Sequence, residues 1–247
     1  MSNEFIVGRK PVIEALKAGT FIEKIYILHG SHGESVELIR KLARQRNVLC
    51  AESDKDMFNA IPNESLAQGV MARVGLKQYV EIENILSAVA SKNESPFLLV
   101  FDEIEDPHNL GALIRSAVCF GVHGGIIPKH HSASINPTVV KTSAGASEHF
   151  LIAKVTNIVS TLDNLKSKGV WIIGADAKGE KSIEEIDFTM PLAIVIGNEG
   201  KGIRRLVKEQ CDFLVRIPMA ASFDSLNASV AGALLMYEVA KCRMNKK

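Results

Sequence analysis

The sequence has few features of a secreted, membrane-spanning or metal-binding protein. Only four of its 247 residues are cysteines, and Cys50, Cys119, Cys211 and Cys242 form no Cys-X-X-Cys pair. This spacing predicts neither a zinc site nor a disulfide framework, and it favours the reducing cytoplasm. No apolar run reaches the roughly 18 residues that cross a bilayer. The segment Met1–Phe5 lacks a basic region followed by an apolar core, so we expect no signal peptide.

An excess of charge of one sign is also lacking. The formal net charge is +1, from 29 Lys and Arg residues against 28 Asp and Glu residues. This balance excludes a protein that binds nucleic acid through overall basicity, so contacts with RNA would have to come from local clusters. Charge runs usually form solvated faces. The two candidate phosphate-binding clusters are Arg40, Lys41, Arg44 and Arg46, and Lys241, Arg243, Lys246 and Lys247.

The apolar pattern predicts two α/β domains. In residues 1–75, short apolar strands alternate with amphipathic helices over 11–18 and 34–47. Residues 76–95 have few strand formers and carry three acidic residues against two lysines. We interpret them as a linker that contains a short helix. Residues 96–247 form the second domain.

In the second domain, strands and helices alternate, as in a largely parallel sheet covered by helices. The predicted strands are 97–101, 125–128, 150–153, 170–174, 192–196 and 213–217. The predicted helices are 111–120, 136–144, 158–168, 203–210 and 227–242. Ligands of such sheets bind beyond the carboxyl ends of the strands. Three motifs follow predicted strands and are therefore expected at that edge.

The first motif is Gly197-Asn198-Glu199-Gly200-Lys201-Gly202. Its three glycines permit positive φ angles and close approach of the backbone to a ligand. The same residues also suit a tight strand-to-helix turn, in which the helix dipole favours Glu199. Both readings stay open from these residues alone. The motif matches neither the dinucleotide-binding nor the Walker A pattern, which disfavours a nucleotide-dependent oxidoreductase.

The second motif is Asp106-Pro107-His108-Asn109 and continues to Arg115-Ser116-Ala117. Asn109 and Arg115 flank a turn and a helix start, so both side chains could point toward the strand edge. Arg115 suits bidentate binding of phosphate or carboxylate, and the alternative is a structural ion pair with Glu103 or Glu199. The histidines at 108, 130 and 131 lack metal-ligand spacing, so we expect no metal.

The third motif is Ile217-Pro218-Met219, followed by Ser225-Leu226-Asn227-Ala228-Ser229. Ser225 or Asn227 could cap the final helix, since Ser and Asn accept hydrogen bonds from the amides of a helix start. The helix that follows is rich in Ala, Gly and Leu, so we expect it to pack closely in a core or an interface.

In this order and spacing, the three motifs closely resemble those of the SpoU/TrmH family of RNA ribose 2′-O-methyltransferases. The similarity covers the whole chain, and residues 7–16 through 68–70 look like the ribosomal-protein-like substrate-binding domain of that family. The two-domain layout is most similar to members that modify a guanosine of 23S rRNA. The resemblance implies a SPOUT-type α/β domain with a deep trefoil knot, a homodimer, and S-adenosylmethionine as cofactor.

The resemblance also implies roles for individual residues. The cofactor would lie against the main chain around Gly197, Ile217 and Leu226, with Glu199, Met219 and Asn227 as neighbours. Arg115 would act on the ribose hydroxyl; because a guanidinium has a pKa above about 12, stabilising the developing alkoxide is simpler than acting as a base. The remaining catalytic candidates, which would position Arg115, the substrate or the knot loop, are Asn109, Glu199, Ser225 and Asn227.

Two other functions compete with this interpretation. The same chemistry could act on another rRNA site or on tRNA. A non-catalytic RNA-binding or ribosome-assembly factor could keep the fold, but the presence of all five catalytic candidates argues against it.

Overall fold

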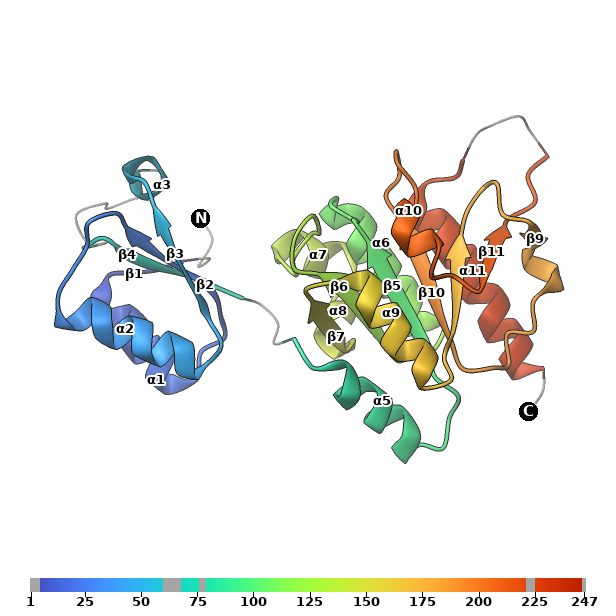
Figure 1. The fold of residues 1–247 in the computed structure, drawn as a ribbon, viewed down its shortest axis with the longest axis horizontal. Helices are drawn as coiled ribbons and strands as arrows, with labels where there is room; N and C mark the ends of the chain where they lie inside the picture. Colours follow the sequence, from blue (N-terminus) through green and yellow to red (C-terminus); the bar gives the residue numbers. More distant parts are fainter. Residues whose placement is uncertain (1–4, 60–67, 76–78, 221–224, 246–247) are drawn as a thin grey trace. The chain divides into compact units, whose positions relative to one another are not determined.

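A computed structural model describes residues 5–59, 68–75, 79–220 and 225–245 of the chain. The chain divides into two compact units, Met1–Gln78 and Tyr79–Lys247. Figure 1 shows that each unit has its own sheet and its own covering helices. Among the described residues, no helix is both long enough and apolar enough to cross a membrane.

The first unit is a four-stranded mixed sheet in the order β1-β4-β2-β3, in which β2 and β3 are parallel and β4 is antiparallel to β1 and β2. Two helices, α1 and α2, cover one face and the short α3 lies on the other (Figure 1). Its elements are β1 (Phe5–Val7), α1 (Arg9–Ala18), β2 (Ile22–Leu28), α2 (Glu34–Gln45), β3 (Leu49–Ser53), α3 (Lys55–Asn59) and β4 (Val70–Val74).

The second unit is built on a seven-stranded sheet in the order β7-β6-β5-β10-β8-β11-β9, and all its neighbouring strands are parallel. The strands are β5 (Phe97–Asp102), β6 (Gly124–Pro128), β7 (Ile152–Val155), β8 (Trp171–Ala175), β9 (Lys181–Ser182), β10 (Leu192–Gly197) and β11 (Phe213–Arg216). The parallel sheet with helical cover confirms the predicted fold class. β5 and β10 pair in register from Phe97 opposite Leu192 to Asp102 opposite Gly197, so two of the three motif loops start side by side.

Helices cover both faces of this sheet (Figure 1). One face packs against α6, α7, α8 and α11, and the other against α5, α9 and α10. Since both faces are buried, every residue of β5 and of β10 is buried. The helices are α5 (Ile82–Ser91), α6 (Pro107–Cys119), α7 (Pro137–Thr142), α8 (Ala146–His149), α9 (Ile158–Ser167), the 3₁₀ turn η1 (Ile183–Glu185), α10 (Arg205–Lys208) and α11 (Ala228–Met244).

Residues 79–95, which we interpreted as part of a linker, are packed within the second unit. The helix α5 buries Ile85 and Val89 completely or nearly so, against the same face as α9. Val80 forms a bridge to Ala153 of β7. The polar and acidic composition of this segment describes only the exposed side of α5, which is why it was read as a linker.

Two predicted helices are shorter than expected. The segment 136–144 is helical only as α7, because Ala144 and Gly145 adopt positive φ angles of 51° and 82° that separate it from α8. The segment 203–210 is helical only as the four-residue α10. There, Arg204 keeps an extended backbone, and its amide donates to the buried carboxylate of Asp102 at 2.8 Å.

Arg243 anchors the last turn of α11 to neighbouring segments of the main chain. Its guanidinium donates to the main-chain carbonyls of Ser95, Pro96, Phe188 and Met190 at 2.7–3.1 Å, and it lies over the Phe97 ring at 5.2 Å. Of the two sequence readings for Arg243, a phosphate ligand or a residue of a solvated face, neither applies, because its donors are used inside the fold. In the same cluster, Lys246 and Lys247 lie outside the described residues.

Candidate active site

Three predicted catalytic residues meet at the carboxyl edge of the second sheet. Asn109 donates from Nδ2 to Oε2 of Glu199 at 3.1 Å. Asn227 donates from Nδ2 to Oε1 of Glu199 at 3.0 Å and to Oδ1 of Asn109 at 3.1 Å. These hydrogen bonds form a closed ring between segments that are 28 to 118 residues apart in the sequence. We call Asn109, Glu199 and Asn227 the polar triad.

Asn109 is placed by the start of α6. Asp106 is the N-cap residue, and its carboxylate accepts hydrogen bonds from the amides of His108 and Asn109 at 3.1 and 3.3 Å. Pro107 occupies the first helical turn, where its missing N–H costs nothing. The loop after β5 therefore turns at once into a helix, and Asn109 stays at the strand edge.

Glu199 is carried by a closed turn after β10. Asn198 and Gly202 exchange backbone hydrogen bonds at 2.8 and 3.1 Å, and Gly202 has a φ of +68°. The side chain of Asn198 accepts from the amides of Gly200 and Lys201 and donates to the carbonyl of Glu103. This turn presents Glu199 toward Asn109 without help from a ligand.

The need for glycine at position 197 has a local explanation. A Cβ atom there would stand 2.3 Å from the backbone of Gly202 and Ile203, a distance that forces the turn open. A larger residue at this position would thus disturb the turn itself, whether or not a cofactor lies against it. Both readings of the glycine motif, a tight turn and a ligand loop, remain compatible with this packing.

Asn227 both caps α11 and joins the polar triad. Its Oδ1 accepts from the amides of Ser229 and Val230 at 2.9 and 3.3 Å and from the Ser229 hydroxyl at 2.6 Å. Since Oδ1 is used as the cap, Nδ2 must face Asn109 and Glu199. The predicted capping by Asn227 is confirmed, and its catalytic role stays a prediction that the cap does not exclude.

Arg115 does not join the polar triad. It lies within α6 together with Asn109, and six helical residues correspond to about 600° of rotation and a rise of about 9 Å. The expectation that both side chains point to the strand edge is therefore wrong. Arg115 is exposed. It makes no hydrogen bond or ion pair with the described residues: Glu103 pairs with Arg204, and Glu199 with the two asparagines.

The third motif lies beside the triad. Ile217 and Leu226 are half-buried, Met219 is 38% exposed and Ser225 is exposed. Ile217 packs against the main core beneath the sheet edge. Among the described residues, Ser225 has no hydrogen-bond partner, so its predicted catalytic role stays a prediction.

A buried ion pair supports the site, and the sequence reasoning missed it. Asp102, at the carboxyl end of β5, is fully buried and binds Arg204 through the Nε donor at 2.7 Å and a second guanidinium nitrogen at 2.5 Å. The hydrogen bond to Asp102 is the main reason that the pKa of Arg204 is raised. An acidic residue at the end of a wholly apolar strand was the available signal, since a buried carboxylate requires a partner.

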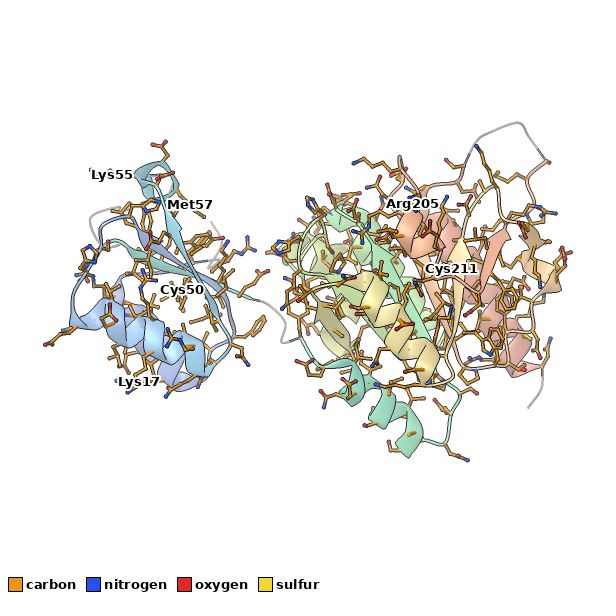
Figure 2. The ribbon with its side chains drawn as sticks, viewed as in Figure 1. Lys17, Cys50, Lys55, Met57, Arg205 and Cys211 are labelled. Carbon is orange, nitrogen blue, oxygen red and sulfur yellow. The ribbon has the colours of Figure 1, made fainter. Side chains whose placement is uncertain are left out.

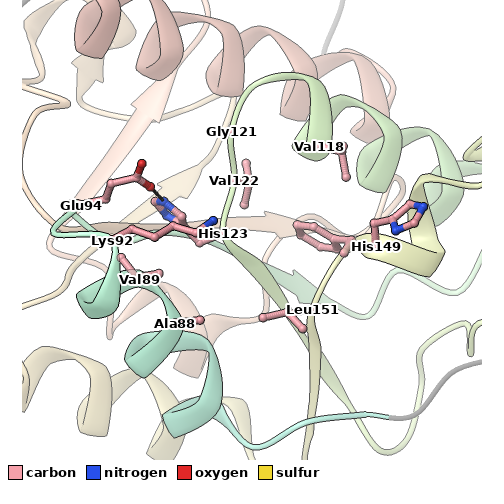
Figure 3. Close-up of a pocket in the computed structure, with 11 residues that line it drawn as sticks. Ala88, Val89, Lys92, Glu94, Val118, Gly121, Val122, His123, His149 and Leu151 are labelled. Atoms are coloured by element: carbon pink, nitrogen blue, oxygen red, sulfur yellow. Dashed lines mark hydrogen bonds and ion pairs between the residues drawn. The ribbon is translucent and has the colours of Figure 1, made fainter. Parts of the chain in front are cut away.

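The described residues of the second unit form at least two hollows, and neither of these two is lined by the predicted cofactor residues. The first, of about 310 Å³, lies at the amino ends of β6 and β7 (Figure 3). In it, His123 bonds to Glu94 at 2.8 Å and accepts the amide of Phe97 at 3.0 Å. It lies at the opposite edge of the sheet from the polar triad. The second hollow lies at the carboxyl edge.

Comparison with known proteins identifies the family. The SpoU rRNA Methylase family matches residues 96–237, and the family described as RNA 2′-O ribose methyltransferase substrate binding matches residues 5–80. YacO of Bacillus subtilis, assigned to the TrmH family of tRNA/rRNA methyltransferases, is 41% identical over 241 residues, which are 98% of this chain and 96% of YacO. The chain belongs to the SpoU/TrmH family of RNA 2′-O-ribose methyltransferases.

Solved structures of SpoU/TrmH proteins share this fold. The SpoU methyltransferase AviRb from Streptomyces viridochromogenes, in complex with AdoMet, is 25% identical with a TM-score of 0.63, over 98% of this chain and 90% of AviRb. The TrmH/SpoU tRNA modifying enzyme of A. aeolicus is 28% identical with a TM-score of 0.57, over 66% of this chain and 85% of that enzyme. Membership of the SpoU family implies the expected knot.

Proposed function

We propose that this protein transfers a methyl group from S-adenosylmethionine to a ribose 2′-hydroxyl of RNA. The observation that carries the proposal is the polar triad, which is assembled at the ligand edge of a SpoU/TrmH fold. A similar structure, that of AviRb, contains AdoMet. Asn, Glu and Arg side chains suit orientation and charge stabilisation, which such a reaction needs more than a covalent intermediate.

The residues around the triad fit this cofactor. Ile217, Met219 and Leu226 leave apolar surface uncovered at the sheet edge, as the flat adenine ring requires. The turn that ends at Gly202 and the carboxylate of Glu199 offer polar groups beside them. The cofactor would supply a methyl group already activated on a sulfonium, while Glu199 and the asparagines fix the loops between which cofactor and ribose meet.

Arg115 would act in the site of a second copy of this chain. It has no hydrogen-bond or ion-pair partner among the described residues, and Val118, one turn along the same face of α6, is 42% exposed. Four more apolar side chains form an exposed stripe along the adjacent α11: Val230, Leu234, Tyr237 and Met244. Phe120 and Tyr237 join the two helices by an edge-to-face contact at 5.9 Å. We call this apolar surface of α6 and α11 the dimer face, and we propose that it forms a homodimer.

Mixing two inactive variants tests this arrangement. Arg115→Ala and Asn109→Ala should each abolish methyl transfer as homodimers. If Arg115 serves the partner's triad, a mixed dimer has one intact site, so mixing should restore about a quarter of the activity. No restoration, despite subunit exchange shown by tagged subunits, would mean that Arg115 acts within its own chain. Leu234→Glu should give monomers by light scattering, whereas Leu49→Glu, at the 61% exposed leucine of β3, should not.

A guanosine of 23S rRNA is the proposed target, because residues 5–80 match the substrate-binding family and the two-domain layout resembles rRNA-modifying members. The proposed place of action is the cytoplasm, where this RNA is found. The test is a map of ribose methylation across total RNA with and without the gene. Loss of one 23S rRNA mark supports the target. Loss of a tRNA mark keeps the chemistry and changes the substrate, and no loss, together with no cofactor binding by calorimetry, favours a non-catalytic RNA-binding factor.

A further inference from the structure

A second hollow lies on the same sheet edge as the polar triad. It has a volume of about 380 Å³ and is formed by the ends of β6 and β7, the start of α9 and the segment around α10. Arg204, on its wall, is five residues beyond Glu199 in the loop after β10. The hollow and the triad are therefore built on opposite ends of one short loop. A hollow of this size accepts a group as large as a nucleotide.

The ionisable side chains that line the hollow are two arginines and two histidines. They are His130, His131, Arg204 and Arg205, and no Asp or Glu is among the described lining residues. The other polar lining residues are Thr156 and Asn157. Carboxylates outside the lining pair with three of these groups: Asp102 and Glu103 with Arg204, Glu209 with Arg205, and Glu105 with His131. The described lining of the hollow therefore offers hydrogen-bond donors to an anion, and no acidic side chain in that lining repels the anion.

The two arginines differ in how they are held. Arg204 is fixed by the fully buried Asp102 and contacts Glu103 at 3.4 Å. Arg205 lies on α10 (Figure 2) and pairs with Glu209 one turn away. Both members of that pair are more than half exposed, at 77% and 53%. Exposed pairs contribute little, so Arg205 can exchange Glu209 for a phosphate at small cost.

We propose that this hollow binds a backbone phosphate of the substrate RNA, next to the nucleotide whose ribose lies at the polar triad. The proposal rests on the proposed function, since it takes the RNA to be the methyl acceptor. An RNA strand presents phosphates at regular intervals on either side of each ribose. The basic hollow is one short loop away from the triad, and we therefore place the phosphate next to the reacting ribose in this hollow. Arg204 would give the rigid wall, and Arg205 would close on the ligand.

The test compares Arg205→Gln with Glu209→Gln. Both variants break the same exposed ion pair, but only the first removes a cation from the hollow. The probe is transcribed 23S rRNA, and binding is measured from about 50 to 200 mM salt. Lys168→Gln is the matched control, because Lys168 pairs with Glu83 at the end of α9 that is opposite the hollow. Arg204 is left unchanged, since its loss would strand Asp102 in the core.

Arg205→Gln should weaken RNA binding about 3- to 10-fold at the lowest salt, and the slope of log affinity against log salt should fall by about one. Glu209→Gln should leave affinity unchanged or raise it, and Lys168→Gln should leave it unchanged. Wild-type affinity and slope in Arg205→Gln would overturn the proposal. Equal weakening by Glu209→Gln would also overturn it, because the pair would then matter only for the fold of α10.

The proposed function fails separately. If the wild-type protein transfers no methyl group to any RNA but Arg205→Gln weakens RNA binding with a shallower salt slope, the hollow stands and the enzymatic function falls. If the wild type methylates RNA and Arg205→Gln has unchanged affinity and KM, the function stands and the hollow falls. If the wild type binds no RNA, the hollow is not an RNA site.

Discussion

Substitution of Asn227 should separate the capping of α11 from the chemistry of the site. Asn227→Ala removes the Oδ1 acceptor of two backbone amides and the Nδ2 donor to Asn109 and Glu199. Loss of an N-cap asparagine costs about 1 kcal/mol. For the second unit, which is in the 150–250 residue range, this corresponds to a fall in Tm of about 2–4 °C. Asn227→Ser keeps an oxygen that can cap, so its stability should stay within a few tenths of a kcal/mol of the wild type.

Both variants should lose activity. Neither carries the amide group that holds Glu199 against Asn109, and misplacement of reacting groups by about 1 Å can cost about 100-fold in rate. We therefore expect kcat for RNA methylation to fall about 100-fold in both. Asn136→Ala is the control, since Asn136 caps α7 through a 3.0 Å bond to the amide of Val139 and lies outside the triad. It should lose comparable stability and keep its kcat.

The measurements are chemical denaturation for stability and single-turnover methyl transfer for rate. Asn227→Ser decides the matter. If it keeps the wild-type rate, the triad does not position the reacting groups. If Asn227→Ser loses as much stability as Asn227→Ala, the cap of α11 depends on the triad contacts. The two roles of Asn227 are then not separable, which refutes the argument from geometry.

Two further predictions concern stability. Arg243→Ala should lower the free energy of unfolding by about 2–4 kcal/mol, because four carbonyls lose a charged donor. The control Lys241→Ala should lower it by less than about 0.5 kcal/mol. Equal losses of both variants in chemical denaturation would contradict the proposed role of Arg243 in holding α11. Burial raises the pKa of Cys211 to about 12 from an ordinary value of 9.0, so the folded state holds this proton more tightly than the unfolded state. The stability that this thiol contributes is complete below pH 9 and is lost as pH rises toward 12. The unfolding free energy of Cys211→Ala should therefore decline less steeply between pH 9 and 11 than that of the wild type. Parallel curves would contradict the raised pKa.

The sheet of the second unit could be predicted because its strands are short continuous apolar runs. Such runs occur where both faces of a strand are covered, and this explains why the ends of β5 and β10 were placed nearly to the residue. The helix α5 was predicted as a short helix, but its packing into the second unit was not, for the opposite reason. Only two of its side chains, Ile85 and Val89, are fully buried, so its composition is that of a solvated segment.

The candidate site could be predicted in part. Motif spacing placed Asn109, Glu199 and Asn227 at one edge because parallel strands share their carboxyl ends. The side on which Arg115 lies depends on where α6 begins. Asp106 starts the helix before Asn109 rather than after it. Asn109 and Arg115 therefore lie in one helix, and their side chains point about a third of a turn apart. The partners of Asp102 and Arg243 are set by tertiary contacts about 100 and 150 residues away, which no local pattern contains.

The helix α11 links stability, assembly and catalysis in one element. Its first turn is capped by Asn227 of the triad, its exposed stripe forms most of the proposed dimer face, and its last turn is held by Arg243. A shift of α11 along its axis would therefore move Asn227 away from Glu199 and displace the partner that would receive Arg115. If this coupling holds, Arg243→Ala should lower kcat as well as stability, even at temperatures where the variant is fully folded. Wild-type kcat in folded Arg243→Ala would show that the cap alone is sufficient to place Asn227.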